Sequence, residues 1–110
     1  MATAHAHQAL ITPLKGDNYP TWKLQCQMAL MRDGLWDIVN ATETRPAEEG
    51  DAQTKFDKRR DKALANIVLS VDTSLLYIIG SDPKCPVQVW EKLANQFQKK
   101  TWANKLRLRK

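Results

Sequence analysis

Apolar residues recur at three- and four-residue intervals between proline and glycine breaks, and this spacing restricts the fold more than any other feature of the chain. It is the spacing of a helix with a buried face, and it recurs in residues 22–31, 56–71 and 89–97. No run of useful length alternates apolar and polar residues as a half-buried strand does. The sequence therefore predicts an all-α fold with four to five helices in one small bundle.

The first helix is expected to begin near Pro20, because proline suits the first turn of a helix and biases Tyr19 toward extended backbone. Two apolar stripes follow at helical spacing: one has Trp22, Cys26, Ala29 and Leu30, and the other has Leu24, Met28, Met31 and Leu35. They predict a helix that is buried on more than one side and ends at Gly34. A short apolar segment, residues 35–39, comes after it.

Two further helices are expected in the middle of the chain. Residues 40–50 predict a loop, and Asp51 is expected to cap a second helix. One stripe of that helix would hold Phe56, Arg60, Ala63, Ile67 and Val71, with Leu64 and Val68 beside it. The apolar run at 75–79 predicts a short third helix that is capped by Asp72 or Thr73, with a strand as the alternative.

The last part of the sequence predicts two more helices. Pro86 is expected to open a fourth helix, with Trp90, Leu93 and Phe97 on one face. Thr101 is expected to cap a fifth helix, whose apolar pattern still runs when the sequence ends.

Basic residues gather at one end of the chain. Residues 99–110 carry six basic side chains and no acid; since the whole chain has a formal net charge of +5, the rest sums to −1. RNA is therefore a candidate partner through this segment, where Trp102 could stack on a base. The candidate contacts are Lys99, Lys100, Trp102, Lys105, Arg107, Arg109 and Lys110. The alternative is an amphipathic helix with Trp102 and Leu106 toward the core and the charges toward water.

No arrangement of residues typical of an active site is present. The two histidines, His5 and His7, lie near the N-terminus, and neither Cys26 nor Cys85 has a histidine close in sequence. Two isolated cysteines are typical of free thiols in a reducing compartment. No signal peptide and no apolar run of the roughly 18–20 residues of a membrane span occur. We expect a cytoplasmic, non-enzymatic protein without metal, cofactor, small-molecule substrate or membrane contact.

Five segments, in order and at suitable spacing, resemble those of copia-type retrotransposon Gag polypeptides. The first, with Leu14, Gly16, Asn18, Tyr19 and Trp22, is similar to the opening Leu-x-Gly-x-Asn-Tyr-x-x-Trp of that family. The others are Leu35–Trp36, Lys62–Ala63 with Ile67, Val89–Trp90 with Leu93 and Phe97, and Asn104–Leu108. Each segment is weak alone, and the series of five makes the resemblance specific.

The resemblance implies a structural role without catalysis or cofactor. Residues 13–110 would form a capsid-like helical domain similar to the N-terminal part of a Gag capsid, incomplete at its C-terminus, and residues 1–12 a flexible leader. Such polypeptides self-associate into particles that package element RNA. We therefore expect a homo-oligomer. The alternatives are an RNA-binding module that uses the basic C-terminal segment and a domesticated Gag that serves as an adaptor for a protein partner.

Overall fold

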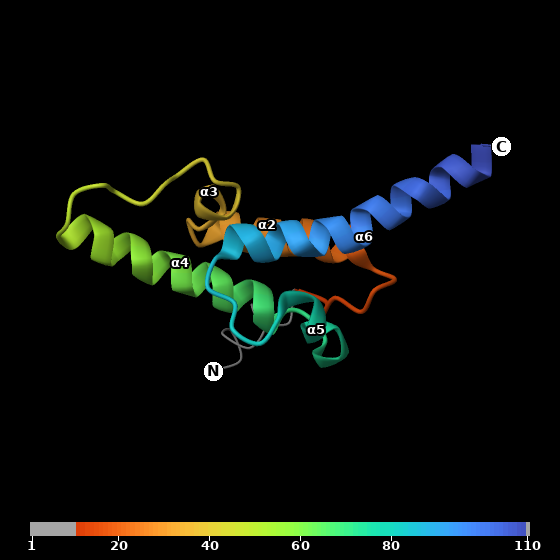
Figure 1. Cartoon of the computed structure of the whole chain (residues 1–110), viewed down its shortest axis with the longest axis horizontal. Coiled ribbons are helices and arrows are strands. Elements are labelled where there is room, and N and C mark those ends of the chain that lie inside the picture. The colour runs from red at the N-terminus through yellow and green to blue at the C-terminus, as the bar shows by residue number, and fades with distance from the viewer. Residues whose placement is uncertain (1–10, 110) are drawn as a thin grey trace.

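A computed structural model of the chain describes the backbone of residues 11–109 and the side chains of residues 11–98 (Figure 1). Apart from a single parallel bridge between Leu14 and Val71, this part of the chain contains no strand. Its elements are α2 (Tyr19–Arg32), α3 (Trp36–Val39), α4 (Asp51–Leu69), the 3-10 helix η1 (Thr73–Leu75), α5 (Leu76–Ile79) and α6 (Pro86–Arg109). The predicted all-α class is confirmed.

The helices surround one core, and two segments extend from it. α4 packs on α6, α3 packs against both, and α5 packs on α6. α2 contacts α3 and α4, and its Tyr19 and Trp22 rings lie against rings of α6. The loop of residues 40–50 and the first turns of α4 extend from the core at one end, and α6 extends from it at the other (Figure 1). No helix within the described residues is long and apolar enough to cross a bilayer.

The boundaries of α2 agree with the prediction. The helix begins at Tyr19 with Pro20 in its first turn. It stops at Gly34, whose φ of +72° is a left-handed conformation that glycine adopts without strain. The Leu35 N–H donates to the Leu30 carbonyl at 2.8 Å. This carbonyl at the end of α2 is therefore satisfied at the point where the chain turns away from the helix.

The expectation that α2 is buried on more than one side is wrong. Only the stripe with Trp22, Cys26 and Leu30 is buried. Three residues of the second stripe face outward along the helix, because no described element covers them: Leu24 is 61% exposed, Met28 46% and Met31 50%. The fourth, Leu35, lies beyond the end of α2 and is buried. Periodicity shows which residues share a face of a helix, but it does not show whether another element packs on that face.

The second and third helices form as predicted, with small shifts at their ends. Gly50 rather than Asp51 is the N-cap residue of α4, so Asp51 lies in the first turn. α4 ends at Leu69, and Val71 leaves the helix for its bridge with Leu14. Asp72 caps η1, since its side chain accepts from the Ser74 N–H at 3.1 Å. The helical interpretation of residues 75–79 is confirmed over the strand alternative.

The predicted break before a fifth helix is wrong. α6 runs without interruption from Pro86 to Arg109, so the expected fourth and fifth helices are one. No glycine or proline follows Pro86, and a threonine inside a helix costs well under roughly 1 kcal/mol relative to alanine. Thr101 therefore does not end the helix. The side chains from Lys99 to Lys110, which include all the candidate RNA contacts, lie outside the described side chains, as do His5 and His7.

Candidate functional site

The entry segment that precedes α2 is joined to the end of α4 through its backbone. The Leu14 N–H donates to the Ser70 carbonyl, and the Leu14 carbonyl accepts from the Asp72 N–H, both at 2.9 Å. The Leu14 side chain is fully buried in the core. This residue thereby fixes the entry segment to a part of the chain more than fifty positions later.

Asn18 holds the turn between Leu14 and α2. Its Oδ1 accepts from the Lys15 N–H and its Nδ2 donates to the Pro13 carbonyl, both at 2.9 Å. Gly16 lies inside this turn with a φ of +99°, a conformation that an L side chain rarely adopts. Asn18 and Gly16 are therefore motif residues that shape the backbone, although neither is buried in the core.

Five aromatic rings make a continuous row through the core. Tyr19 stacks on Phe97, with ring centroids 5.8 Å apart, and lies 6.0 Å from Trp22. Trp90 then contacts Trp22 and Trp36, each with a centroid separation of 5.4 Å. Such pairs add about 0.5–1.5 kcal/mol to the area that they bury. The row links α2, α3 and α6 into one unit.

A small buried polar group adjoins this aromatic row. The Trp22 Nε1–H donates to the Ser70 Oγ at 3.0 Å, and that hydroxyl donates to the Ile67 carbonyl at 2.7 Å. The Cys26 Sγ lies 3.9 Å from the same oxygen. Burial raises the pKa of the Cys26 thiol to about 11, and the contact with Ser70 opposes this shift in part. Cys26 is thus a neutral core side chain rather than a nucleophile.

The motif residues named from the sequence meet in this core. Most of them are buried, namely Leu14, Tyr19, Trp22, Leu35, Ala63, Ile67, Leu93 and Phe97. Trp36 and Trp90 are partly buried and pack against these side chains. Sequence reasoning missed Ser70, the single buried polar residue of the described part of the chain. No local pattern marks it, because its partner Trp22 is 48 positions away.

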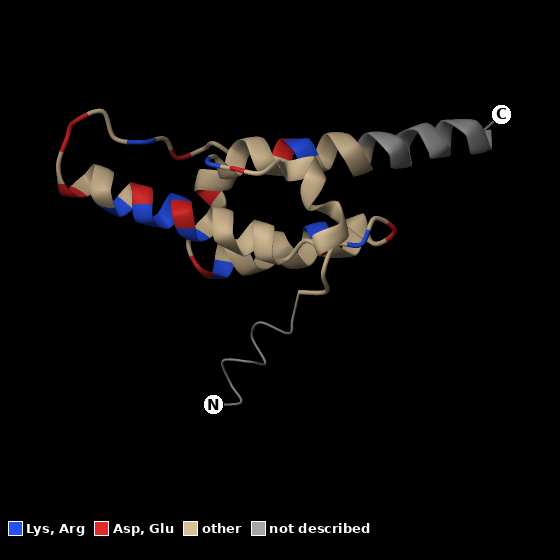
Figure 2. Ribbon diagram, turned by 60° about the horizontal axis from the view of Figure 1, so that its bottom comes forward, with Lys and Arg blue, Asp and Glu red and all other residues tan. Residues whose placement is uncertain are grey.

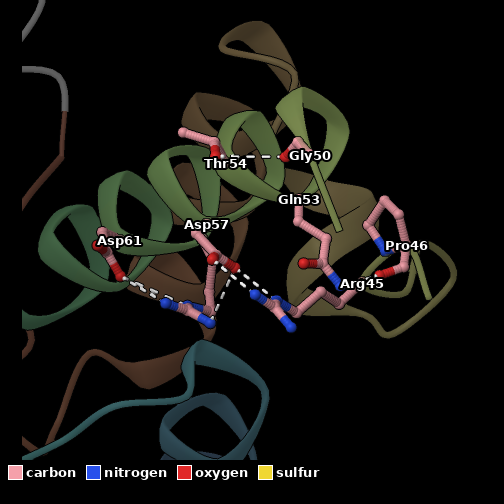
Figure 3. A network of polar contacts seen from close by, with 8 residues as sticks. Arg45, Pro46, Gly50, Gln53, Thr54, Asp57 and Asp61 are labelled. Atoms are coloured by element: carbon pink, nitrogen blue, oxygen red, sulfur yellow. Dashed lines mark hydrogen bonds and ion pairs between the residues drawn. The ribbon is translucent and has the colours of Figure 1, made fainter. Parts of the chain in front are cut away.

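Ion pairs hold the 40–50 loop against α4. Arg45 binds Asp57 with two hydrogen bonds of 2.9 and 3.1 Å (Figure 3). Arg59 binds Glu43 through two hydrogen bonds of 2.7 and 2.9 Å and also donates to the Gly34 carbonyl at 2.6 Å. Hydrogen bonds from Arg59 lower the pKa of Glu43, and those from Arg45 lower the pKa of Asp57.

None of these polar groups is arranged for catalysis. A half-open hollow of about 440 Å³ lies between the end of α5 and the start of α6, with Cys85 and Lys92 in its wall. The Lys92 amine already donates to the Ile79 carbonyl, and the chain has no histidine after His7 to activate the thiol. No group of His, Cys, Asp and Glu side chains able to hold a metal ion occurs in the described region.

The surface of the helices divides into charged and uncharged parts. Acidic and basic residues are interspersed along α4 from its first turns onward (Figure 2). Among them, Lys55, Lys58 and Lys62 are exposed. The outward face of α2 differs, since its exposed side chains Leu24, Met28 and Met31 are apolar. Contiguous exposed apolar residues are typical of protein contacts, and exposed lysines of a solvated face.

Comparison with known proteins identifies the family of the chain. Neither the curated proteins nor the solved structures contain a match. The family model of the gag-polypeptide of LTR copia-type matches residues 26–110, which is most of the chain. The match begins at Cys26, so the motif of Leu14 to Trp22 precedes it. Polypeptides of that family are structural and non-catalytic, in line with the expected absence of enzymatic activity. The chain belongs to the copia-type LTR gag-polypeptide family.

Proposed function

We propose that this chain is a structural, capsid-like Gag module that acts by self-association in particle assembly. The observation that carries the proposal is the family match over residues 26–110. The described side chains support it, because the aromatic row and Ser70 are occupied in holding the fold. Three exposed large apolar side chains, Leu24, Met28 and Met31, lie together on the outside of α2, where they are available to another protein.

Sedimentation velocity of the 110-residue chain from micromolar to millimolar concentration tests this function. A self-associating module shifts from monomer to larger species as concentration rises, by mass action. Light scattering on the same samples gives the mass of the species. A chain that remains monomeric over the whole range contradicts the proposal.

RNA binding is a second candidate function, favoured by the six basic residues of 99–110. Fluorescence anisotropy with a labelled single-stranded RNA should show affinity that falls steeply as salt rises, since neutralised phosphates release counterions. Replacing these six residues by glutamine should abolish binding. A control with three of the six charge changes replaces the exposed Lys55, Lys58 and Lys62 of α4 by glutamine, and it should retain most of the binding. Equal losses in both variants would indicate a general charge effect and contradict a role specific to the C-terminal segment.

A further inference from the structure

Three apolar side chains share the outward face of α2: Leu24, Met28 and Met31. We name this surface the α2 stripe. Their exposed fractions are 61%, 46% and 50%, although all three are large and hydrophobic. Positions that differ by three or four residues lie on one side of a helix, so the three form a continuous surface. Methionine adapts its shape to a partner more readily than branched side chains do.

The inward side of α2 keeps the stripe in this orientation. Trp22, Cys26 and Leu30 on that side are fully buried. The Trp22 indole is fixed as well, through its hydrogen bond to the Ser70 hydroxyl at 3.0 Å. Rotation of α2 to bury the stripe would expose these side chains and break this bond. The stripe is therefore a stable surface of the folded chain.

The three side chains of the α2 stripe are uncharged. At 3.6 residues per turn they fall within an arc of about 60°, and Lys23 lies about 100° from Leu24. The Lys23 amine points elsewhere, since it donates to the Gln98 Oε1 at 3.4 Å and lies 6.0 Å from the centroid of the Tyr19 ring. Arg32, four residues after Met28 and about 40° around the helix from it, borders the stripe, and its guanidinium pairs with Asp33 at 3.4 Å. α2 itself contains no acidic residue.

We propose that the α2 stripe is a contact between two copies of this chain, which pack antiparallel about a two-fold axis near Met28. The inference rests on the self-association proposed above and names its surface. A two-fold contact brings a patch against itself, so any charge on it would face a like charge. The uncharged stripe avoids this repulsion. Around such an axis Leu24 packs beside Met31 of the partner subunit.

The size of the stripe predicts a weak contact. Stable complexes bury roughly 800 Å² on each partner, and three side chains on one helix cover much less than that. A single pair of copies should therefore associate only at high concentration. In a larger assembly the same contact would gain strength from the other contacts that hold the copies together.

Charged substitutions at Met28 test the proposal in the 110-residue chain. Because Met28 lies next to the two-fold axis, Met28→Glu or Met28→Lys alone would place like charges together. Each should weaken self-association by about tenfold or more in sedimentation equilibrium. An equimolar mixture of the two should regain it, since opposite charges then meet. Leu69→Glu, at the end of α4 where the side chain is 83% exposed, is the matched control and should associate like the parent.

The possible outcomes test the proposed contact surface separately from the proposed function. If the parent chain associates and both Met28 variants associate equally well, the α2 stripe is not the contact, and the proposed function stands. If the variants lose association but their mixture does not regain it, a two-fold contact at Met28 is contradicted. A monomeric parent chain overturns both proposals. Circular dichroism and thermal unfolding of each variant should match the parent, because the substituted side chain is exposed.

Discussion

The two ends of α4 are held by different forces. At its C-terminal end, Ala63 and Ile67 are fully buried and Ser70 binds the Trp22 indole. At its N-terminal end, Phe56 is buried outside the main core cluster, and Asp57 and Arg59 are held by partly exposed ion pairs with the 40–50 loop. Burial of apolar surface contributes about 25 cal/mol per Å², whereas exposed ion pairs contribute about 0–1 kcal/mol. The C-terminal end should therefore determine global stability, and the N-terminal end should open first.

Trp22→Ala should have the largest effect, because it removes the central ring of the aromatic row. We expect a loss of about 3–5 kcal/mol in the free energy of unfolding, measured by urea denaturation. Tyr77→Ala is the control: this ring is 74% exposed, and its removal should change stability by less than about 0.5 kcal/mol. Equal losses of unfolding free energy in the two variants would contradict the conclusion that the buried side chains determine global stability.

Ser70→Ala should have an intermediate effect. The substitution leaves the buried Trp22 Nε1–H without its acceptor, which costs about 1–3 kcal/mol. Urea denaturation again measures the change, with the exposed Ser81→Ala as control. The loss should nearly vanish in a Trp22→Phe background, because that ring has no N–H to satisfy. A loss that persists there would assign Ser70 a role independent of the indole.

Arg59→Ala should have a smaller and more local effect. It removes the bonds to Glu43 and to the Gly34 carbonyl, but the Arg59 side chain is 40% exposed, and solvent screens the pair. We expect a change below about 1 kcal/mol that shrinks as salt rises. Hydrogen exchange should quicken in residues 43–61 and stay unchanged in α6, and Lys58→Ala serves as control. Faster exchange in α6 would show that the two ends of α4 are coupled.

Acid pH should have the smallest effect on the structure, and this effect should again be confined to the N-terminal end of α4. The lowered pKa values of Glu43 and Asp57 mean that their ion pairs stabilise the fold above the ordinary values of 4.5 and 3.8. This contribution is lost as pH falls through the lower folded-state values. Amide spectra recorded down to acid pH should therefore change around these residues before the aromatic core responds. An Arg59→Ala chain with an unchanged titration of Glu43 would contradict this cause.

Local signals in the sequence predicted the ends of elements well. Pro20, Gly34, Asp72 and Pro86 act on their immediate neighbours through fixed φ, left-handed backbone or side-chain capping, and the structure has each in its expected place. Thr101 shows the limit of such signals. A residue able to cap a helix also fits inside one, and nothing nearby stops α6.

Features that depend on distant residues could not be predicted. The outward face of α2 has the same periodicity as a buried face, and only the placement of the other helices leaves Leu24 and Met28 uncovered. Ser70 is an ordinary polar residue until the fold brings Trp22 to it. The aromatic residues of the core followed from their size and spacing, whereas the contacts among them needed the assembled chain.

The row of rings also has a consequence for synthesis. The rings of α2 pack against residues that lie far along the chain: Trp22 contacts Ser70, which is 48 positions later, and Trp90, and Tyr19 stacks on Phe97. A ribosome that makes this chain releases α2 well before it has made α6. During that interval both faces of α2 present apolar side chains to chaperones and to neighbouring nascent chains. Once α3, α4 and α6 have all emerged, they cover one face of α2 together, and the other face stays exposed in the finished protein.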